Sequence, residues 1–197
     1  MQPPIHVSLR GVTKEYESKL GRTHALGPID IDLRRSEFFA VVGPSGCGKS
    51  TLLDVIAGLT KPDQGCVLAD DQVVAGPGRH RLVMFQDSAL FPWLTVFGNV
   101  MFGLKRSPEL TRQQRREIAA YHLQLVGLEK FSKSYVHELS GGMRQRVALA
   151  RSLAPDPRVL LMDEPLAALD ALTREQLYFD IQDIWQRRRK TIILVVA

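Results

Sequence analysis

The stretch GPSGCGKST, residues 43–51, constrains the fold of this chain more than any other feature. It matches the pattern G-x-x-x-x-G-K-[ST], in which glycines let successive backbone N–H groups turn toward phosphate oxygens. The apolar run FFAVV before it predicts a strand buried on both faces, and Leu52, Ile56 and Leu59 predict one face of a following helix. Strand, loop and helix in this order predict a nucleotide-binding loop made by Gly43, Pro44, Ser45, Gly46, Cys47, Gly48, Lys49, Ser50 and Thr51.

Polar residues suited to phosphate chemistry occur in this loop and after two other predicted strands. Lys49 is expected to reach the β- and γ-phosphates, and the Ser50 hydroxyl to ligate Mg²⁺. VLLMDEP places Asp163 and Glu164 directly after a strand, at the edge where open α/β sheets bind ligands. We expect Asp163 to hold Mg²⁺ through a water and Glu164 to accept a proton from the attacking water, although such a pair also caps helices. Gln86, after the run RLVMF, is a candidate to touch that Mg²⁺ and that water, although a strand-end glutamine usually has no such role.

A second glycine pair opens another helix far downstream, in LSGGMRQR at residues 139–146. Ser140 stands where an N-cap is expected, and Gly141 and Gly142 leave the first helical amides uncovered by side chains. This arrangement predicts a second anion site. The alternative is a glycine turn into an ordinary helix, but two glycines lower helix stability and a plain N-cap needs neither.

Hydrophobic periodicity predicts the order of the remaining elements. HVSLRGV and IDIDL alternate as half-buried strands do, and VLLM and TIILVV are solid apolar strands. Three helices are expected: 111–128 with Ile118, Tyr121, Leu125 and Leu128 on one face, 141–154 ended by Pro155 and Pro157, and 171–186 packed by Leu177, Ile181 and Ile184 or Trp185. Strand, helix and strand with solid apolar strands predict an α/β fold, with a parallel sheet flanked by helices.

GPSGCGKST, Gln86, LSGGMRQR, VLLMDEP and LAALD, in this order, resemble the ATP-binding subunit of an ABC transporter, over essentially the whole chain. LSGGMRQR is the most family-specific of these motifs, because phosphate loops occur in many unrelated ATPases. The resemblance implies ATP and Mg²⁺ as cofactors and one domain over 1–197 with a P-loop NTPase core. That core is expected at about 1–87 and 156–197, with an N-terminal antiparallel β portion and an inserted α-helical subdomain at about 88–155.

The resemblance also implies a head-to-tail homodimer. Ser140, Gly141 and Gly142 of one copy then close on the γ-phosphate held by Lys49 of the other. Asp170, in LAALD, resembles the aspartate that links the two sites across the dimer; the alternative is an N-cap for the helix starting near Ala171.

Further matches concern the base and the membrane partner. Tyr16, in VTKEYE, is where the family places an aromatic that stacks on adenine; the alternative is a half-buried strand tyrosine. DSALFPWLTVFGNVMFGL is where the family contacts its membrane-spanning permease, although its aromatics Phe91, Trp93, Phe97 and Phe102 also suit a helical core. LFPWLTVFGNV and DALTR look most like importers of the nitrate, sulfonate and taurine group, which implies an extracytoplasmic solute-binding protein as well.

Composition limits the compartment and the partners. No apolar run approaches the roughly 20 residues that span a bilayer, the start lacks a secretory pattern, and two cysteines fit neither a disulfide framework nor a zinc site. The expectation is a peripheral protein on the cytoplasmic face of the inner or plasma membrane. The net charge is +5, with basic clusters at 112–116 and 187–190, but no aromatics interleave with them. They indicate solvated helix faces, and no nucleic-acid partner is expected.

One feature of the family is missing. The resemblance implies a histidine just past the strand TIILVV, but the sequence stops at Ala197, and all five histidines precede Asp163: His6, His24, His80, His122 and His137. The expectation is a domain truncated at its C-terminus relative to the family, which binds ATP and hydrolyses it poorly. The leading interpretation is the ATPase subunit of a small-solute importer. The alternatives are a degenerate nucleotide-sensing copy that only dimerises, and a soluble ABC ATPase outside transport.

Overall fold

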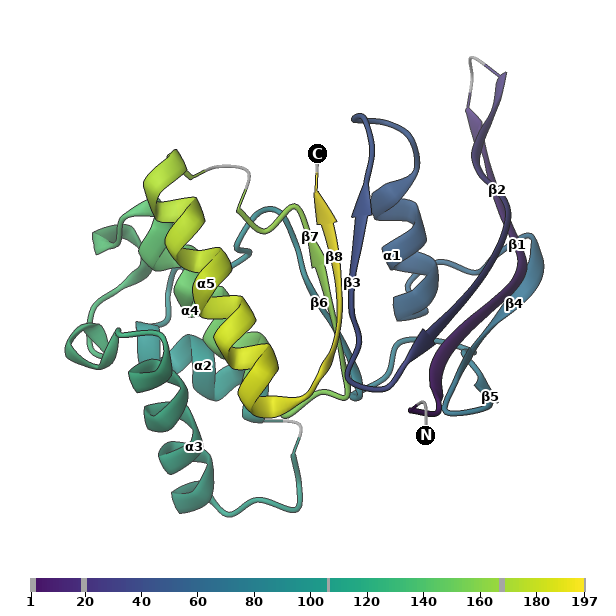
Figure 1. The fold of residues 1–197 in the computed structure, drawn as a ribbon. Coiled ribbons are helices and arrows are strands. Elements are labelled where there is room, and N and C mark those ends of the chain that lie inside the picture. The colour runs from purple at the N-terminus through teal and green to yellow at the C-terminus, as the bar shows by residue number, and fades with distance from the viewer. Residues whose placement is uncertain (1–2, 19–20, 106, 167–168, 197) are drawn as a thin grey trace.

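The computed structural model describes residues 3–18, 21–105, 107–166 and 169–196. These residues form two four-stranded sheets, one antiparallel in the order β2-β1-β4-β5 and one parallel in the order β3-β8-β7-β6. Helices lie on both faces of the parallel sheet, and the antiparallel sheet stands to one side of it (Figure 1). The predicted α/β class and the N-terminal antiparallel portion are confirmed.

The antiparallel sheet is built on a long hairpin of β1 (Ile5–Ser18) and β2 (Gly21–Arg34). On its other side β1 pairs with β4 (Gln64–Ala69), which in turn pairs with the short β5 (Gln72–Val73). Val7 and Leu9 are fully buried, as the pattern in HVSLRGV predicts, but His6 and Ser8 are buried as well, so this part of β1 is covered on both faces rather than half-buried. The far end of the hairpin projects beyond the rest of the molecule (Figure 1).

The parallel sheet contains β3 (Phe38–Val42), β6 (Arg81–Met84), β7 (Val159–Asp163) and β8 (Thr191–Val196). Its side chains alternate between two separate cores. Leu160 and Met162 of β7 belong to the core shared with the helices downstream of β6, whereas Val159 and Leu161 belong to the core shared with α1 (Lys49–Ala57) and the antiparallel sheet. The two faces of one sheet therefore carry different helices.

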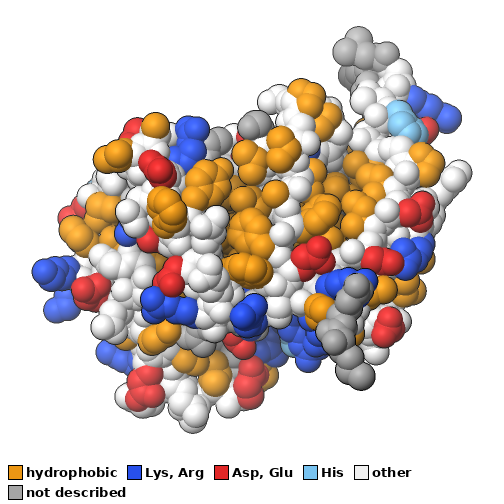
Figure 2. Space-filling model, in the orientation of Figure 1, with side chains coloured by type: hydrophobic (Ala, Val, Ile, Leu, Met, Phe, Trp, Pro, Cys, Tyr) orange, Lys and Arg blue, Asp and Glu red, His pale blue; other side chains and the backbone are white. Residues whose placement is uncertain are grey.

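The prediction that the strand before the phosphate loop is buried on both faces is wrong. β3 is an edge strand that pairs with β8 only among the described residues, and Ala40 is exposed while Val42 is 75% exposed. Phe39 and Val41 are half-buried against one core, whereas on the other face only Phe38 is half-buried, so the apolar run does not reveal that the second face is largely uncovered. Hydrophobic side chains gather near the middle of the face seen in Figure 2.

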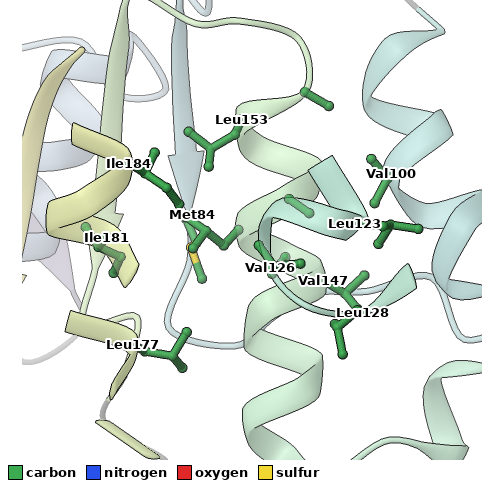
Figure 3. Close-up of a cluster of buried hydrophobic side chains, with 14 of the residues drawn as sticks. Met84, Val100, Leu123, Val126, Leu128, Val147, Leu153, Leu177, Ile181 and Ile184 are labelled. Atoms are coloured by element: carbon green, nitrogen blue, oxygen red, sulfur yellow. The ribbon is translucent and has the colours of Figure 1, made fainter. Parts of the chain in front are cut away.

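The second core is helical (Figure 3). It joins α2 (Val96–Leu104), α3 (Arg112–Leu125), α4 (Gly141–Leu153) and α5 (Ala171–Arg188), with short 3₁₀ turns η1 (Glu129–Phe131) and η2 (Val136–Glu138) between α3 and α4. α4 ends before Pro155, and Leu177, Ile181 and Ile184 of α5 are buried, as predicted. None of the helices in the described part of the chain is long and apolar enough to cross a membrane.

One residue of each of two predicted helix faces needs correction. In α3 Ile118 and Leu125 pack half-buried against the helical core, and Leu128, just after the helix, is buried in it, as predicted, but Tyr121 is 45% exposed. Leu59 lies outside α1 and is 49% exposed, because Gly58 takes the left-handed conformation and ends the helix before it. Apolar residues at helical spacing can therefore also occur on the surface.

The basic clusters lie on helix ends, as expected. Arg115 donates to the backbone carbonyl of Ser107, and the Arg116 guanidinium lies 5.9 Å from the centre of the Phe97 ring. In the second cluster Arg187 pairs with Asp183 within α5. These contacts within the chain match solvated helix faces.

At the start of β7 a polar network ties the two sheets together. Asp70, after β4, pairs with Arg35 and with Arg158 at 2.7 Å, and its Oδ1 is 3.6 Å from Nε2 of the buried His6. Nδ1 of His6 lies 2.7 Å from the hydroxyl of Thr191 at the start of β8. Because Asp163 and Glu164 follow the other end of β7, this network is at the end of the sheet opposite them.

Candidate active site

The phosphate loop (residues 43–51) runs from the end of β3 into the first turn of α1. Gly48 caps the helix with φ 96°, a conformation that side-chain-bearing residues rarely adopt. A Cβ on Gly48 would lie 2.2 Å from the backbone oxygen of Ala25 in the neighbouring hairpin. Glycine is therefore required here both by conformation and by space. Pro44, Ser45, Gly46, Cys47 and Ser50 are exposed, while Gly43, Gly48 and Thr51 are half-buried.

Lys49 is held over this loop. Its side chain is buried, and Nζ donates to the carbonyl oxygens of Gly43 at 2.7 Å and Pro44 at 2.9 Å. The same Nζ lies 3.6 Å from Oε1 of Glu164. A buried ammonium needs such partners, since an uncompensated charge is costly in this setting. The lysine thus bridges the loop and the carboxylate after β7.

Glu164 and Gln86 meet above the ends of adjacent strands. Glu164 follows β7 with φ 41°, and its N–H donates to the carbonyl of Val195 in β8 at 3.2 Å. Nε2 of Gln86 lies 3.5 Å from Oε2 of Glu164. A positive φ at a residue with a side chain is strained, and such strain concentrates at functional sites. Lys49, Gln86 and Glu164, predicted from three separate motifs, are therefore neighbours in space.

Asp163 has the properties of a metal-ligating carboxylate. Its Oδ1 is buried and has no hydrogen-bond partner within the described residues. Burial and the charge of Asp163 raise the pKa of Asp54 on α1, so two carboxylates share this region. Ser50 lies one turn before Asp54, on the same side of α1. A cation beside Asp163 and Ser50 would relieve this repulsion and satisfy the orphaned oxygen.

These residues suit Mg²⁺ in particular. The described part of the chain has no group of three or more His, Cys, Asp or Glu that could hold a metal by themselves. Mg²⁺ is typically bound through one or two protein oxygens, with waters and substrate phosphates completing its shell. The proximity of Asp54 to Asp163 was not predicted from the sequence; the spacing of four residues between Ser50 and Asp54 indicates only that the two lie on one side of the helix.

The second glycine pair starts α4 as predicted. The Ser140 hydroxyl accepts the N–H of Met143 at 3.3 Å, which makes Ser140 the N-cap. A Cβ on Gly142 would lie 2.7 Å from Cγ2 of Thr173 on α5, whereas one on Gly141 would be 3.8 Å from its nearest neighbour, Leu169. Packing against α5 therefore gives Gly142 a structural reason to be glycine. No such contact explains Gly141.

The two glycine-bearing helix starts lie on opposite sides of the parallel sheet. Buried residues of α1, such as Leu53 and Ile56, belong to one core, while Val147 and Leu149 of α4 belong to the other. Figure 1 shows the sheet standing between the two helices. The helix that begins at residues 140–142 therefore packs on the face of the sheet opposite the helix that follows the phosphate loop.

Two further predicted residues, Tyr16 and Asp170, contact other parts of the described chain. Tyr16 on β1 is 42% exposed, with Nζ of Lys14 5.5 Å from its ring centre, and its role at the base stays a prediction. Asp170 is the N-cap of α5: its Oδ1 accepts the N–H of Thr173 at 3.0 Å, and this hydrogen bond lowers the pKa of Asp170. Residues 167 and 168 of LAALD, and Ala197, lie outside the described residues.

Comparison with known families decides the classification. The profile of a family described as "ABC transporter" matches residues 26–167. The chain belongs to the ABC transporter family. The matched segment contains the phosphate loop, Gln86, residues 139–146 and the Asp163–Glu164 pair, while Tyr16 and Asp170 lie outside it.

Individual relatives refine this family membership. An uncharacterised ABC transporter ATP-binding protein of Methanocaldococcus jannaschii is 48% identical over 191 residues, which cover 97% of this chain and 71% of that protein. The nitrate import ATP-binding protein NrtD of a Synechocystis species is 47% identical over 191 residues, with the same coverage. The taurine import ATP-binding protein TauB of Pseudomonas aeruginosa is 44% identical over 189 residues, covering 96% of this chain and 72% of that protein. The chain is an ABC ATP-binding subunit similar to the nitrate and taurine importers.

Solved structures confirm the fold. A bacterial ABC transporter cassette, solved as a dimer, superposes with a TM-score of 0.86 at 33% identity, covering 96% of this chain and 87% of that one. A second structure, described as a post-hydrolysis state bound to ADP and phosphate, gives a TM-score of 0.85 at 34% identity. The ABC ATPase cassette predicted from the motifs is therefore the fold that this chain adopts.

Proposed function

We propose that this ABC cassette hydrolyses ATP and supplies the energy for a small-solute importer. The observation that carries the proposal is the meeting of Lys49 and Gln86 at Glu164, at the end of the parallel sheet: Nζ of Lys49 lies 3.6 Å from Oε1, and Nε2 of Gln86 lies 3.5 Å from Oε2. An acceptor carboxylate, a cation and an amide around one point are the groups that hydrolysis of a phosphoanhydride needs. The relative described as bound to ADP and phosphate supports this chemistry.

The proposed reaction uses groups already in place. Lys49 exchanges the carbonyls of Gly43 and Pro44 for the β- and γ-phosphates, so the buried ammonium gains stronger, charged acceptors. Glu164 accepts the proton of the attacking water, and the Gln86 amide orients that water. Asp163 and Ser50 would hold Mg²⁺, which neutralises charge on the phosphate oxygens.

We further propose that hydrolysis takes place in a head-to-tail dimer. The helix that residues 140–142 start packs on the face of the sheet opposite α1, which suits a contact with the nucleotide of a second copy. Exposed amides at a helix N-terminus suit the γ-phosphate. A relative of the same fold is described as a dimer. In this dimer Ser140, Gly141 and Gly142 complete the site of the other copy, and Asp170 lies at the junction.

A membrane-spanning permease is the proposed partner. Phe91 and Phe102 pack at 4.2 Å between ring centres, and Trp93 beside them is 70% exposed. A cavity of about 300 Å³ lies under this cluster, lined by Phe85, Phe91 and Phe102 among others. Exposed aromatics over a cavity mark an interaction site. We propose nitrate, taurine or a similar small solute, delivered by a solute-binding protein, with the cassette bound at the cytoplasmic membrane face.

The decisive experiment measures ATP turnover by the purified chain over a range of protein concentrations. Wild type should show turnover per molecule that rises with concentration as dimers form. Glu164→Gln should lose about 10²–10⁴ of the rate and elute as an ATP-bound dimer, because the proton acceptor is gone while binding remains. Turnover that persists at extreme dilution in a strictly monomeric sample would contradict the dimer. ATP-dependent dimerisation with no measurable turnover would favour a nucleotide-sensing role.

A further inference from the structure

Gln145 is a buried polar residue of α4 that the proposed reaction does not use. Its side chain is 5% exposed, and its Nε2 donates to the backbone carbonyl of Gln86 at 3.1 Å. Its Oε1 is buried and has no partner among the residues that the structure describes. A buried amide with one unpaired end is unfavourable compared with an apolar side chain of the same size. Packing alone therefore does not explain a glutamine here.

A second side chain of the same helix binds the same loop. Arg151 donates from Nη2 to the carbonyl of Ser88 and from Nη1 to the carbonyl of Ala89, both at 2.8 Å. Its guanidinium also lies 5.7 Å from the centre of the Phe91 ring. The loop that follows β6 is thus held by α4 at three backbone carbonyls. Because these acceptors are backbone atoms, the contacts fix the path of the chain rather than any one side chain of the loop.

This loop and the glycine end of α4 face one cavity. Gly141 and Gln145 are four residues apart and lie on the same side of the helix. Together with Gln86 and Ser88 they line a cavity of about 350 Å³. The glutamine therefore stands directly behind the helix start that is proposed to receive the second copy's nucleotide.

The other end of Gln86 reaches the reacting groups. Its Nε2 is 3.5 Å from Oε2 of Glu164, at the long limit for a hydrogen bond. A contact at this limit is lost by a displacement of a few tenths of an ångström. The placement of the Gln86 backbone consequently decides whether its amide and Glu164 act on the same water.

We propose that Gln145, assisted by Arg151, is a positioning residue for Gln86: it fastens the start of the loop to α4 and so sets the distance between the Gln86 amide and Glu164. This inference rests on the proposed ATPase function. It assigns no contact with nucleotide to Gln145. The helix that carries Ser140 and Gly141 and the loop that carries Gln86 then move as one unit.

Gln145→Met tests the inference, because methionine keeps the length and helix propensity but cannot donate to the Gln86 carbonyl. We expect turnover to fall about 10- to 100-fold while KM for ATP stays within about twofold, since a misplaced group costs rate rather than binding. The matched control is Gln113→Met, an exposed glutamine of α3 whose amide donates to Glu117. The control should keep wild-type turnover. Equal turnover of the two variants would overturn the inference.

A double-mutant cycle separates positioning from a general effect on folding. In a Gln86→Ala background, Gln145→Met should change turnover by less than about twofold, because the group that it positions is absent. The same fold-loss in both backgrounds would overturn the inference. If Gln145→Met lowers the melting temperature, Arg151→Lys is the second variant: lysine keeps the charge but cannot span the carbonyls of Ser88 and Ala89. Arg151→Lys should likewise lower kcat while KM for ATP stays within about twofold.

Amide hydrogen exchange tests the contact between Gln145 and the Gln86 loop and does not depend on ATPase activity. Residues 86–91 should exchange faster in Gln145→Met than in wild type and in Gln113→Met, because the loop is released from α4. If wild type shows no ATP turnover, the proposed function fails, yet this comparison still decides the inference. Unchanged exchange in this loop would overturn the positioning role whatever the activity.

Discussion

The helix starts of α1 and α4 both carry glycines, but for different physical reasons. At α1 the backbone demands glycine: Gly48 has φ 96°, and a Cβ would lie 2.2 Å from a backbone oxygen of the same chain. At α4 neither Gly141 nor Gly142 has a left-handed φ, and Gly141 has room for a side chain. The first start is shaped by its own chain. The second leaves its surface open, which suits a ligand held by another molecule.

The largest effect is expected where the backbone demands glycine. Gly48→Ala forces a Cβ into the Ala25 carbonyl and must displace the loop that holds Lys49. We expect ATP affinity to fall more than about 100-fold, together with a loss of about 2–3 kcal/mol in the free energy of unfolding. Equilibrium nucleotide binding and urea unfolding measure the two effects. Near-normal ATP affinity of this variant would mean that the start of α1 does not require glycine at position 48.

Lys49→Ala changes the same site without straining it. Removing charge-assisted contacts worth about 2 kcal/mol should weaken ATP binding by about 30-fold. The structure should tolerate the change better than Gly48→Ala, since no atom is added. The affinity of a fluorescent ATP analogue, with a melting curve as the control, measures this. An unchanged affinity would count against the phosphate-loop assignment.

Gly141→Ala sharpens the comparison most directly. The methyl group fits within the chain, so the monomer should bind ATP normally and gain about 0.5–1 kcal/mol of stability from the better helix former. In a head-to-tail dimer the same methyl group covers exposed amides, and ATP-dependent dimerisation should weaken by about tenfold. Analytical ultracentrifugation in the Glu164→Gln background measures it. Unimpaired dimerisation would mean that this helix start contacts no nucleotide.

The smallest effect is expected from a change at Asp70, at the end of the parallel sheet opposite Asp163 and Glu164. Burial alone raises the pKa of Asp70, but the hydrogen bond from Arg158 and the charges of His6 and Arg35 outweigh it and hold the pKa below its ordinary value of 3.8. The ionised form is therefore stabilised by folding, and its contribution is present above pH 3.8 and lost as the pH falls through the lower folded pKa.

Asp70→Asn should therefore cost about 1 kcal/mol of unfolding free energy at pH 7, a value typical of partly exposed ion pairs. The difference from wild type should shrink below pH 3.8, where the wild-type carboxyl becomes protonated too. Chemical unfolding at pH 7 and pH 3 measures both. ATP affinity at pH 7 should not change. A difference that grows toward acid would contradict the assigned sign.

The sequence predicted which motifs meet in space better than it predicted the packing, for a physical reason. Lys49, Glu164 and Gln86 each follow a strand of one parallel sheet, and parallel strands bring their ends to one edge. Hydrophobic periodicity, by contrast, does not show what covers each face of an element. It predicted that β3 is buried on both faces, although Ala40 and Val42 are exposed, and it placed Tyr121 rather than Ala119 and Leu123 on the buried face of α3.

Gln145 shows a second limit of prediction from sequence. It stands within the most distinctive motif of the chain, yet sequence spacing indicates only that it lies on the same side of α4 as Gly141. Its partner is a backbone carbonyl 59 residues away, and backbone acceptors leave no trace in residue type. The proximity of Asp54 to Asp163 was hidden similarly, because a carboxylate on an amphipathic helix usually faces water.

The position of β3 in the sheet has a mechanical consequence. Among the described residues β3 is hydrogen-bonded to β8 alone, so one ladder of backbone hydrogen bonds fixes its path. Val42, the last residue of β3, joins directly to Gly43. A pull on the lysine-bearing loop would therefore pass through β3 into β8, the strand whose Val195 carbonyl also accepts the N–H of Glu164.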